Sequence, residues 1–104
     1  MIVTLEEAKE WLRIDGDYDD MVIEMLIESA EQYLKNATGK EFDSSNRLAK
    51  LFCLVLIVDW YENRHLMGQK TSEQVRYTIQ SMLAQLKYAG GETDEVQGNS
   101  EIQG

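Results

Sequence analysis

The chain has a single cysteine, Cys53, and a single histidine, His65, which are the two residue types of a Cys–His nucleophilic pair. That chemistry requires the histidine to lie within hydrogen-bond reach of the thiol. Twelve positions on one continuous helix separate two residues by about 18 Å along its axis, so one subunit cannot pair them. We interpret Cys53 as a buried, inert thiol. Without a second histidine or a glycine-rich phosphate loop, we expect no enzyme activity and no cofactor.

The acidic segment "DGDYDD" places Asp15, Asp17 and Asp19 at alternate positions, as at the start of an EF-hand calcium loop. That loop also requires glycine at its sixth position and glutamate at its twelfth. Asp20 and Leu26 stand at those positions. We therefore expect no metal site, and we interpret the segment as a turn followed by the start of a helix.

A second acidic pattern repeats at the spacing of one helical turn, with Asp20, Glu24 and Glu28 each four residues apart. Each like-charge pair at this spacing costs roughly 0.2–0.5 kcal/mol of helix stability, and an opposite pair such as Glu31 with Lys35 returns a similar amount. Two interpretations remain open. The three acids form either a solvated surface or a face turned toward a basic partner or a lumen that must not hold DNA.

The segment "DWYENR" follows eight consecutive apolar residues, Leu51–Val58. Tryptophan, tyrosine and arginine are enriched among the residues that dominate binding at protein interfaces. Trp60 and Arg64 stand one helical turn apart, a spacing that permits a cation–π contact. We predict that Trp60, Tyr61 and Arg64 form part of a subunit interface. For Trp60 an ordinary place in the core is an alternative, and the sequence slightly favours it.

Four helices are needed to position these residues. The first, "VTLEEAKEWLRI", begins at a capping box of Thr4 and Glu7, buries the face that carries Trp11, and ends near a left-handed turn at Gly16. The second follows an N-cap at Asp17, and its expected end is Gly39. No proline interrupts the chain, which favours long helices.

The third helix is predicted to start at Ser44 or Ser45 and to run from about Asn46 to Met67. Because its apolar run has no polar side, it must be central. Either it is the hub of the monomer or a neighbouring copy covers its remaining side, and the sequence permits both together. The fourth helix follows a capping box of Thr71 and Gln74 and is expected to end at Gly90 and Gly91, after an apolar stripe of helical period.

The predicted fold is therefore all-α, a compact bundle of about four helices over residues 1–89, followed by a flexible acidic tail over residues 90–104. A net charge of −9 and the lack of a basic cluster argue against sequence-specific DNA binding. The N-terminus has no secretion signal pattern, and the apolar run falls short of the roughly 20 residues that span a bilayer. We expect a soluble protein, made in the cytoplasm, with no membrane contact.

This order of parts resembles the small head–tail connector (adaptor) proteins of tailed bacteriophages. The resemblance covers about Ile2 to Leu86, and its most specific pieces are "LRIDGDYDD" with the following acidic and apolar helix, and "WYENR". The segment "MGQKTSEQ" departs from the family pattern, because relatives often place prolines before the last helix.

The resemblance implies a structural protein of the virion, which forms a homo-oligomeric ring, commonly dodecameric, beneath the portal protein at the capsid vertex. Such a ring extends the DNA channel, helps to retain packaged DNA, and offers a docking surface to the tail-side connector or tail-completion protein. DNA passes through it without sequence-specific binding. We also predict that Val96 and Ile102 in the tail contact the portal or a neighbouring subunit.

The alternative is an acidic helical interaction or regulatory module, for example an inhibitor that mimics DNA. Such a protein needs carboxylates spaced like phosphates over most of its surface. The apolar and aromatic content of the third helix speaks against it.

Overall fold

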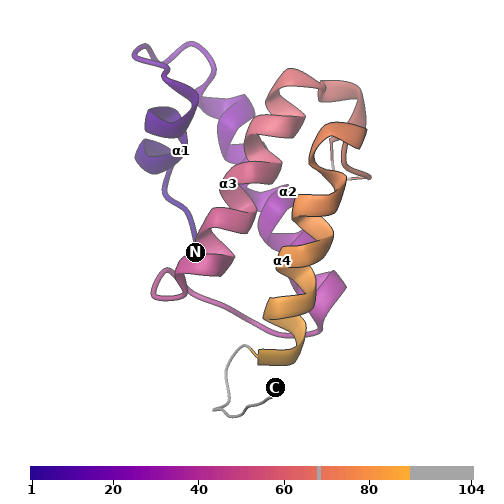
Figure 1. The fold of residues 1–104 in the computed structure, drawn as a ribbon. Coiled ribbons are helices and arrows are strands. Elements are labelled where there is room, and N and C mark those ends of the chain that lie inside the picture. The colour runs from indigo at the N-terminus through magenta and orange to yellow at the C-terminus, as the bar shows by residue number, and fades with distance from the viewer. Residues whose placement is uncertain (68, 90–104) are drawn as a thin grey trace.

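The structure, a computed structural model, describes residues 1–67 and 69–89, and within them the fold is all-α, as predicted (Figure 1). The chain forms four α-helices joined by short connections, with two 3₁₀ turns between the last two helices. In chain order the elements are α1 (Leu5–Leu12), α2 (Asp20–Thr38), α3 (Arg47–Glu62), η1 (Arg64–Leu66), η2 (Glu73–Val75) and α4 (Arg76–Ala89). Residues 90–104, with Val96 and Ile102, lie outside the described residues.

α1 begins as the sequence predicts and ends differently. The Thr4 hydroxyl accepts a hydrogen bond from the Glu7 backbone at 3.1 Å, and the Glu7 carboxylate accepts one from the Thr4 backbone at 3.0 Å, so the capping box is confirmed. The left-handed residue that ends α1 is Arg13 (φ 62°), and the prediction of Gly16 is wrong. The Ile14 N–H reaches back to the Lys9 carbonyl, as in a Schellman motif. Trp11, predicted on the buried face, is 50% exposed.

α2 carries the apolar face that packs on α3, and its limits are partly those predicted. Gly39 ends the helix in the left-handed region (φ 71°), which confirms the predicted stop. The residue at the N-cap is Asp19 and not Asp17, and its side chain makes no capping hydrogen bond. The carboxylate of Asp19 instead contacts Tyr61 and Arg64 at the end of α3. The side chains that α2 buries are Ile23, Leu26, Ile27, Ala30, Leu34 and Thr38.

α3 lies at the centre of the molecule and contacts each of the other three α-helices (Figure 1). Its N-cap is Asn46, whose side chain accepts from the Ala49 backbone at 3.0 Å, so neither Ser44 nor Ser45 is the cap. In the segment "LFCLVLIVDW", six apolar side chains are buried. They are Phe52, Cys53, Leu54, Leu56, Ile57 and Trp60. The monomer therefore covers most of the apolar run by itself.

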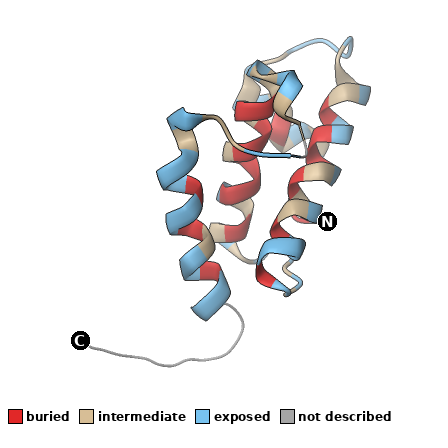
Figure 2. Cartoon of the chain, turned by 90° about the vertical axis from the view of Figure 1, so that its right-hand side faces the viewer, coloured by how far each residue is buried: buried red, intermediate tan, exposed pale blue. Residues whose placement is uncertain are grey.

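Two predictions about the connection from α3 to α4 are wrong. α3 ends at Glu62 rather than Met67 and is followed by the turn η1. α4 begins at Arg76, after η2, and not at a capping box formed by Thr71. Figure 2 shows that α4 buries one side against the bundle and exposes the other, the buried side chains being Ile79, Met82 and Leu86.

The Asp59 side chain explains why the chain turns where it does. This carboxylate is only 4% exposed and accepts hydrogen bonds from the Ser72 backbone at 2.8 Å, the Ser72 hydroxyl at 2.5 Å and the Asn63 amide at 3.3 Å. Asn63 also donates its amide to the Asp59 carbonyl at 2.9 Å, at the point where the helix ends. A buried carboxylate needs such donors, so Asp59 fixes both ends of the connection.

Replacing Asp59 with alanine should lower the free energy of unfolding by about 2–3 kcal/mol, because donors near the connection lose a charged acceptor. Ser72→Ala should cost less, since it removes one donor and leaves the backbone bond. Urea unfolding at neutral pH measures both, and Glu62→Ala, at an exposed position of the same helical turn, is the matched control. Equal stability of Asp59→Ala and Glu62→Ala would contradict this role.

Candidate interface site

Trp60 belongs to the core and presents no surface to a partner. Its side chain has no solvent exposure, and its indole N–H donates to the Lys70 carbonyl at 2.9 Å. The Tyr33 ring meets the Trp60 ring edge-on, with centroids 5.8 Å apart. A residue enclosed in this way cannot contact a second subunit while the fold is intact, so the structure does not support Trp60 as an interface residue.

Tyr61 and Arg64 lie together with Asp19, the residue before α2. The Tyr61 hydroxyl donates to the Asp19 carboxylate at 2.5 Å, and the Arg64 guanidinium lies 3.5 Å from the same oxygen. The guanidinium carbon is 5.1 Å from the centroid of the Tyr61 ring, so the cation–π partner of Arg64 is Tyr61 and not Trp60. This cluster joins the end of α3 to the start of α2 and leaves 54% of the Arg64 side chain exposed.

The hydrogen bond to Asp19 raises the pKa of Tyr61 above its ordinary value. Partial burial and the negative charge of Asp19 act in the same direction, and the cation of Arg64 opposes them. Removing the phenol proton would place two negative charges side by side, which is the physical reason for the shift. The cluster is thus assembled at neutral pH and loses its donor only in strong alkali.

The three predicted acids of α2 have different surroundings. Asp20 pairs with Lys9 of α1 at 2.8 Å, so it is partly neutralised within the subunit. Glu24 and Glu28 are exposed. The expected pair of Glu31 with Lys35 is wrong, because Glu31 accepts hydrogen bonds from the first backbone N–H groups of the chain, and Lys35 pairs with Glu41 at 3.0 Å.

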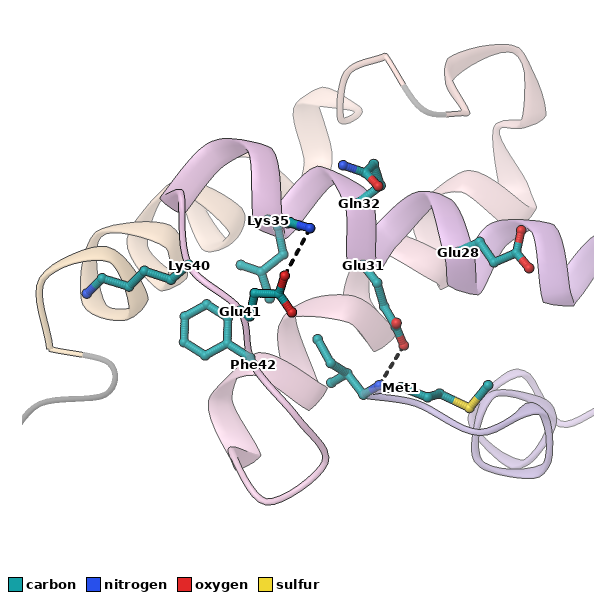
Figure 3. Close-up of a pocket in the computed structure, with 10 residues that line it drawn as sticks. Met1, Glu28, Glu31, Gln32, Lys35, Lys40, Glu41 and Phe42 are labelled. Carbon is teal, nitrogen blue, oxygen red and sulfur yellow. Dashed lines mark hydrogen bonds and ion pairs between the residues drawn. The ribbon is translucent and has the colours of Figure 1, made fainter.

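Figure 3 shows the surface pocket next to these groups, which has a volume of about 320 Å³. Glu31 points to the start of the chain, where its carboxylate binds the N–H groups of Ile2 at 2.7 Å and Val3 at 3.1 Å. Lys40 reaches the Lys87 carbonyl of α4 at 2.6 Å. The charged side chains around the pocket therefore hold the N-terminus and the loop after α2 in place, a structural task.

The two residues considered for nucleophilic chemistry lie in different environments. Cys53 is buried, and burial raises the pKa of its thiol to about 12, with the charge of Glu31 adding to the effect. His65 is exposed, in the turn after α3. Within the described residues, no three His, Cys, Asp or Glu side chains come close enough together to hold a metal ion.

Comparison with known proteins identifies the family. The family model described as "Phage gp6-like head-tail connector protein" matches residues 2–88, most of the chain. This chain belongs to that family. The resemblance inferred from the sequence is confirmed, and the connector is by its family a structural component of the phage head–tail interface. No curated protein and no solved structure matches the chain.

None of the helices in residues 1–67 and 69–89 of the connector is long and apolar enough to cross a membrane.

The surface of the connector carries exposed aromatic side chains that were not predicted from the sequence. Trp11, Tyr77 and Tyr88 are large side chains that stand exposed, Tyr77 by 87% and Tyr88 by 81%. The spacing of the two tyrosines, eleven residues apart on one helix, could have indicated a common face.

Tyr61→Phe should lower the free energy of unfolding of the connector by about 1 kcal/mol at neutral pH, because one partly exposed hydrogen bond is lost. The folded pKa of Tyr61 is raised, so the wild-type advantage is complete below the unfolded value of about 10 and disappears as pH rises through the folded value. Urea unfolding of both proteins at neutral and alkaline pH tests this. A difference that stays constant into alkali would refute the assignment of the hydrogen bond.

Proposed function

We propose that this connector assembles into a homo-oligomeric, dodecameric ring beneath the portal protein. There the ring extends the DNA channel, helps to retain packaged DNA, and gives the tail-side connector or tail-completion protein a docking surface. The observation that carries this proposal is the family match over residues 2–88. A subunit that buries its own hub helix suits such a role, since it can fold before it joins an assembly.

The charge of the chain supports passage of DNA rather than its capture. A channel lined with lysine and arginine would hold phosphates by releasing their counterions, whereas a net charge of −9 opposes this. Glu24 and Glu28 are exposed on α2, while Asp20 is engaged with Lys9. We assign the α2 face of Glu24 and Glu28 to the lumen of the ring.

Two further contacts belong to the proposal. Arg64 keeps half of its side chain exposed beside Tyr61, and these two residues are candidates for the border of a subunit interface. Val96 and Ile102 are isolated apolar residues in an acidic segment, and we assign them to contacts with the portal or a neighbouring subunit.

Native mass spectrometry of the connector, alone and mixed with its portal protein, tests the central proposal. We expect a ring on the portal. Deleting residues 91–104 should leave the thermal midpoint nearly unchanged, because the core lies in residues 1–89, and should weaken portal binding. Normal docking of the truncated protein would remove the tail from the attachment site. Monomers under all conditions would contradict the ring and favour an acidic regulatory module.

The assignment of α2 to the lumen predicts a specific effect of charge reversal. Wild-type connector should not retain DNA near physiological ionic strength. Glu24→Lys with Glu28→Lys should create retention that weakens steeply with added salt. The matched control reverses two other exposed glutamates, Glu6→Lys and Glu62→Lys. DNA retention by assembled rings, measured over a salt series, should be stronger for the α2 variant. Equal retention by both variants would place the lumen elsewhere.

A further inference from the structure

α1 and α4 lie on opposite flanks of the bundle, as Figure 1 shows. Each of them packs on α2 and on α3, which together form the middle of the molecule. A closed ring of identical subunits requires two different surfaces on each subunit, one that meets the preceding copy and one that meets the following copy. The two flanks have the relative placement that such a head-to-tail contact needs.

The outer side of α4 is an exposed stripe that we call the tyrosine face. Its residues follow one another at helical spacing and are Tyr77, Ser81, Ala84 and Tyr88, all exposed. Figure 2 shows this exposed side of α4 turned away from the bundle. α4 contains two basic residues, Arg76 and Lys87, and no acidic residue. Arg76 pairs with Glu73 of η2 at 3.5 Å, so Lys87, whose ammonium lies 6.0 Å from the centroid of the Tyr88 ring, supplies the positive charge beside the tyrosine face. α4 is the one α-helix of the four described whose formal charge is positive.

The opposite flank has an acidic, partly apolar hollow that we call the α1 pocket. It has a volume of about 360 Å³ and is lined by Glu7, Glu10, Trp11, Lys50 and Leu54. Leu51, one turn before Leu54 on α3, is 37% exposed. α1 carries three glutamates and a single lysine, and that lysine is paired with Asp20. Glu7 pairs with Lys50 at 2.7 Å, so Glu10 at the rim supplies the exposed negative charge.

We propose that the tyrosine face of one copy seats against the α1 pocket of the next copy. The inference rests on the proposed ring and names the two surfaces that build it, apart from the Tyr61–Arg64 border. Charge complementarity identifies the occupant as a second copy. In a chain of net charge −9, Lys87 beside the tyrosine face and Glu10 at the rim of the α1 pocket form an attractive pairing. Trp11 and the two tyrosines supply the aromatic anchors that interfaces favour.

A head-to-tail contact can be tested by damaging each side separately. Tyr77→Glu with Tyr88→Glu removes the tyrosine face, and Trp11→Glu blocks the α1 pocket. Loss of an aromatic anchor of this kind weakens association by about thirtyfold or more, so each variant alone should be monomeric. A one-to-one mixture retains one intact pair of surfaces and should form a heterodimer that grows no further. Sedimentation velocity and native mass spectrometry measure this.

Two controls separate the contact from effects of charge and folding. Ser44→Glu with Gln69→Glu adds the same two charges at exposed positions that lie outside both surfaces and outside the Tyr61–Arg64 border, and this variant should assemble normally. Circular dichroism reports whether Trp11→Glu folds. If it does not, Glu10→Arg changes only an exposed rim residue and should still weaken the ring, whereas Glu24→Arg, an exposed position on α2 outside the proposed subunit contacts, should leave it unchanged.

The results distinguish this contact from the ring itself. If Tyr77→Glu/Tyr88→Glu assembles as completely as the wild type, the proposed interface is wrong, but the proposed ring is not contradicted. A mixture that stays monomeric would overturn the head-to-tail pairing of these two surfaces. Wild-type protein that remains monomeric both alone and with the portal would contradict the ring, and this contact with it.

Discussion

The buried carboxylate of Asp59 is the constraint on which the rest of the structure depends. It lies near the end of the central helix, where no cation among the described residues pairs with it, and hydrogen-bond donors from the following segment surround it instead. A buried charge left without donors would cost several kcal/mol, so the chain after Glu62 must bring Ser72 and Asn63 to it. That requirement ends α3 early and sets where the connection to α4 begins.

The two residues that follow Asp59 in the sequence also connect α3 to other parts of the subunit. Trp60 points into the core and binds the Lys70 carbonyl, and Tyr61 reaches Asp19 at the start of α2. The segment that follows the apolar run is therefore a junction at which α2, α3 and the connection to α4 are fixed to one another. The aromatic and charged residues there first serve the fold of the subunit, and among them Glu62 and Arg64 also keep exposed side chains.

Local signals in the sequence predicted much of this fold, and non-local ones were missed. The capping box of Thr4 and the stop at Gly39 depend on residues within one turn, so their types and spacing are sufficient. The Asp59–Ser72 bonds join residues thirteen positions apart, and Glu31 holds backbone groups at the start of the chain. The spacing of residue types along the sequence does not predict contacts between residues so far apart. The end of α3 and the true partner of Glu31 therefore emerged only from the structure.

The two tryptophans show why interface residues are harder to predict than core residues. Both follow an acid and stand near the C-terminal end of a helix, yet Trp60 is enclosed and Trp11 is half exposed. The type of a residue shows that its side chain favours burial. Whether that side chain is covered within the subunit or by a neighbouring copy depends on how the other helices pack around it. α3 has helices around it, whereas α1 lies at the flank of the bundle, where it packs on α2 and α3. Moving apolar surface out of water is favourable, so a neighbouring copy that covers Trp11 would gain free energy. Trp60 offers no such gain, because the subunit already encloses it.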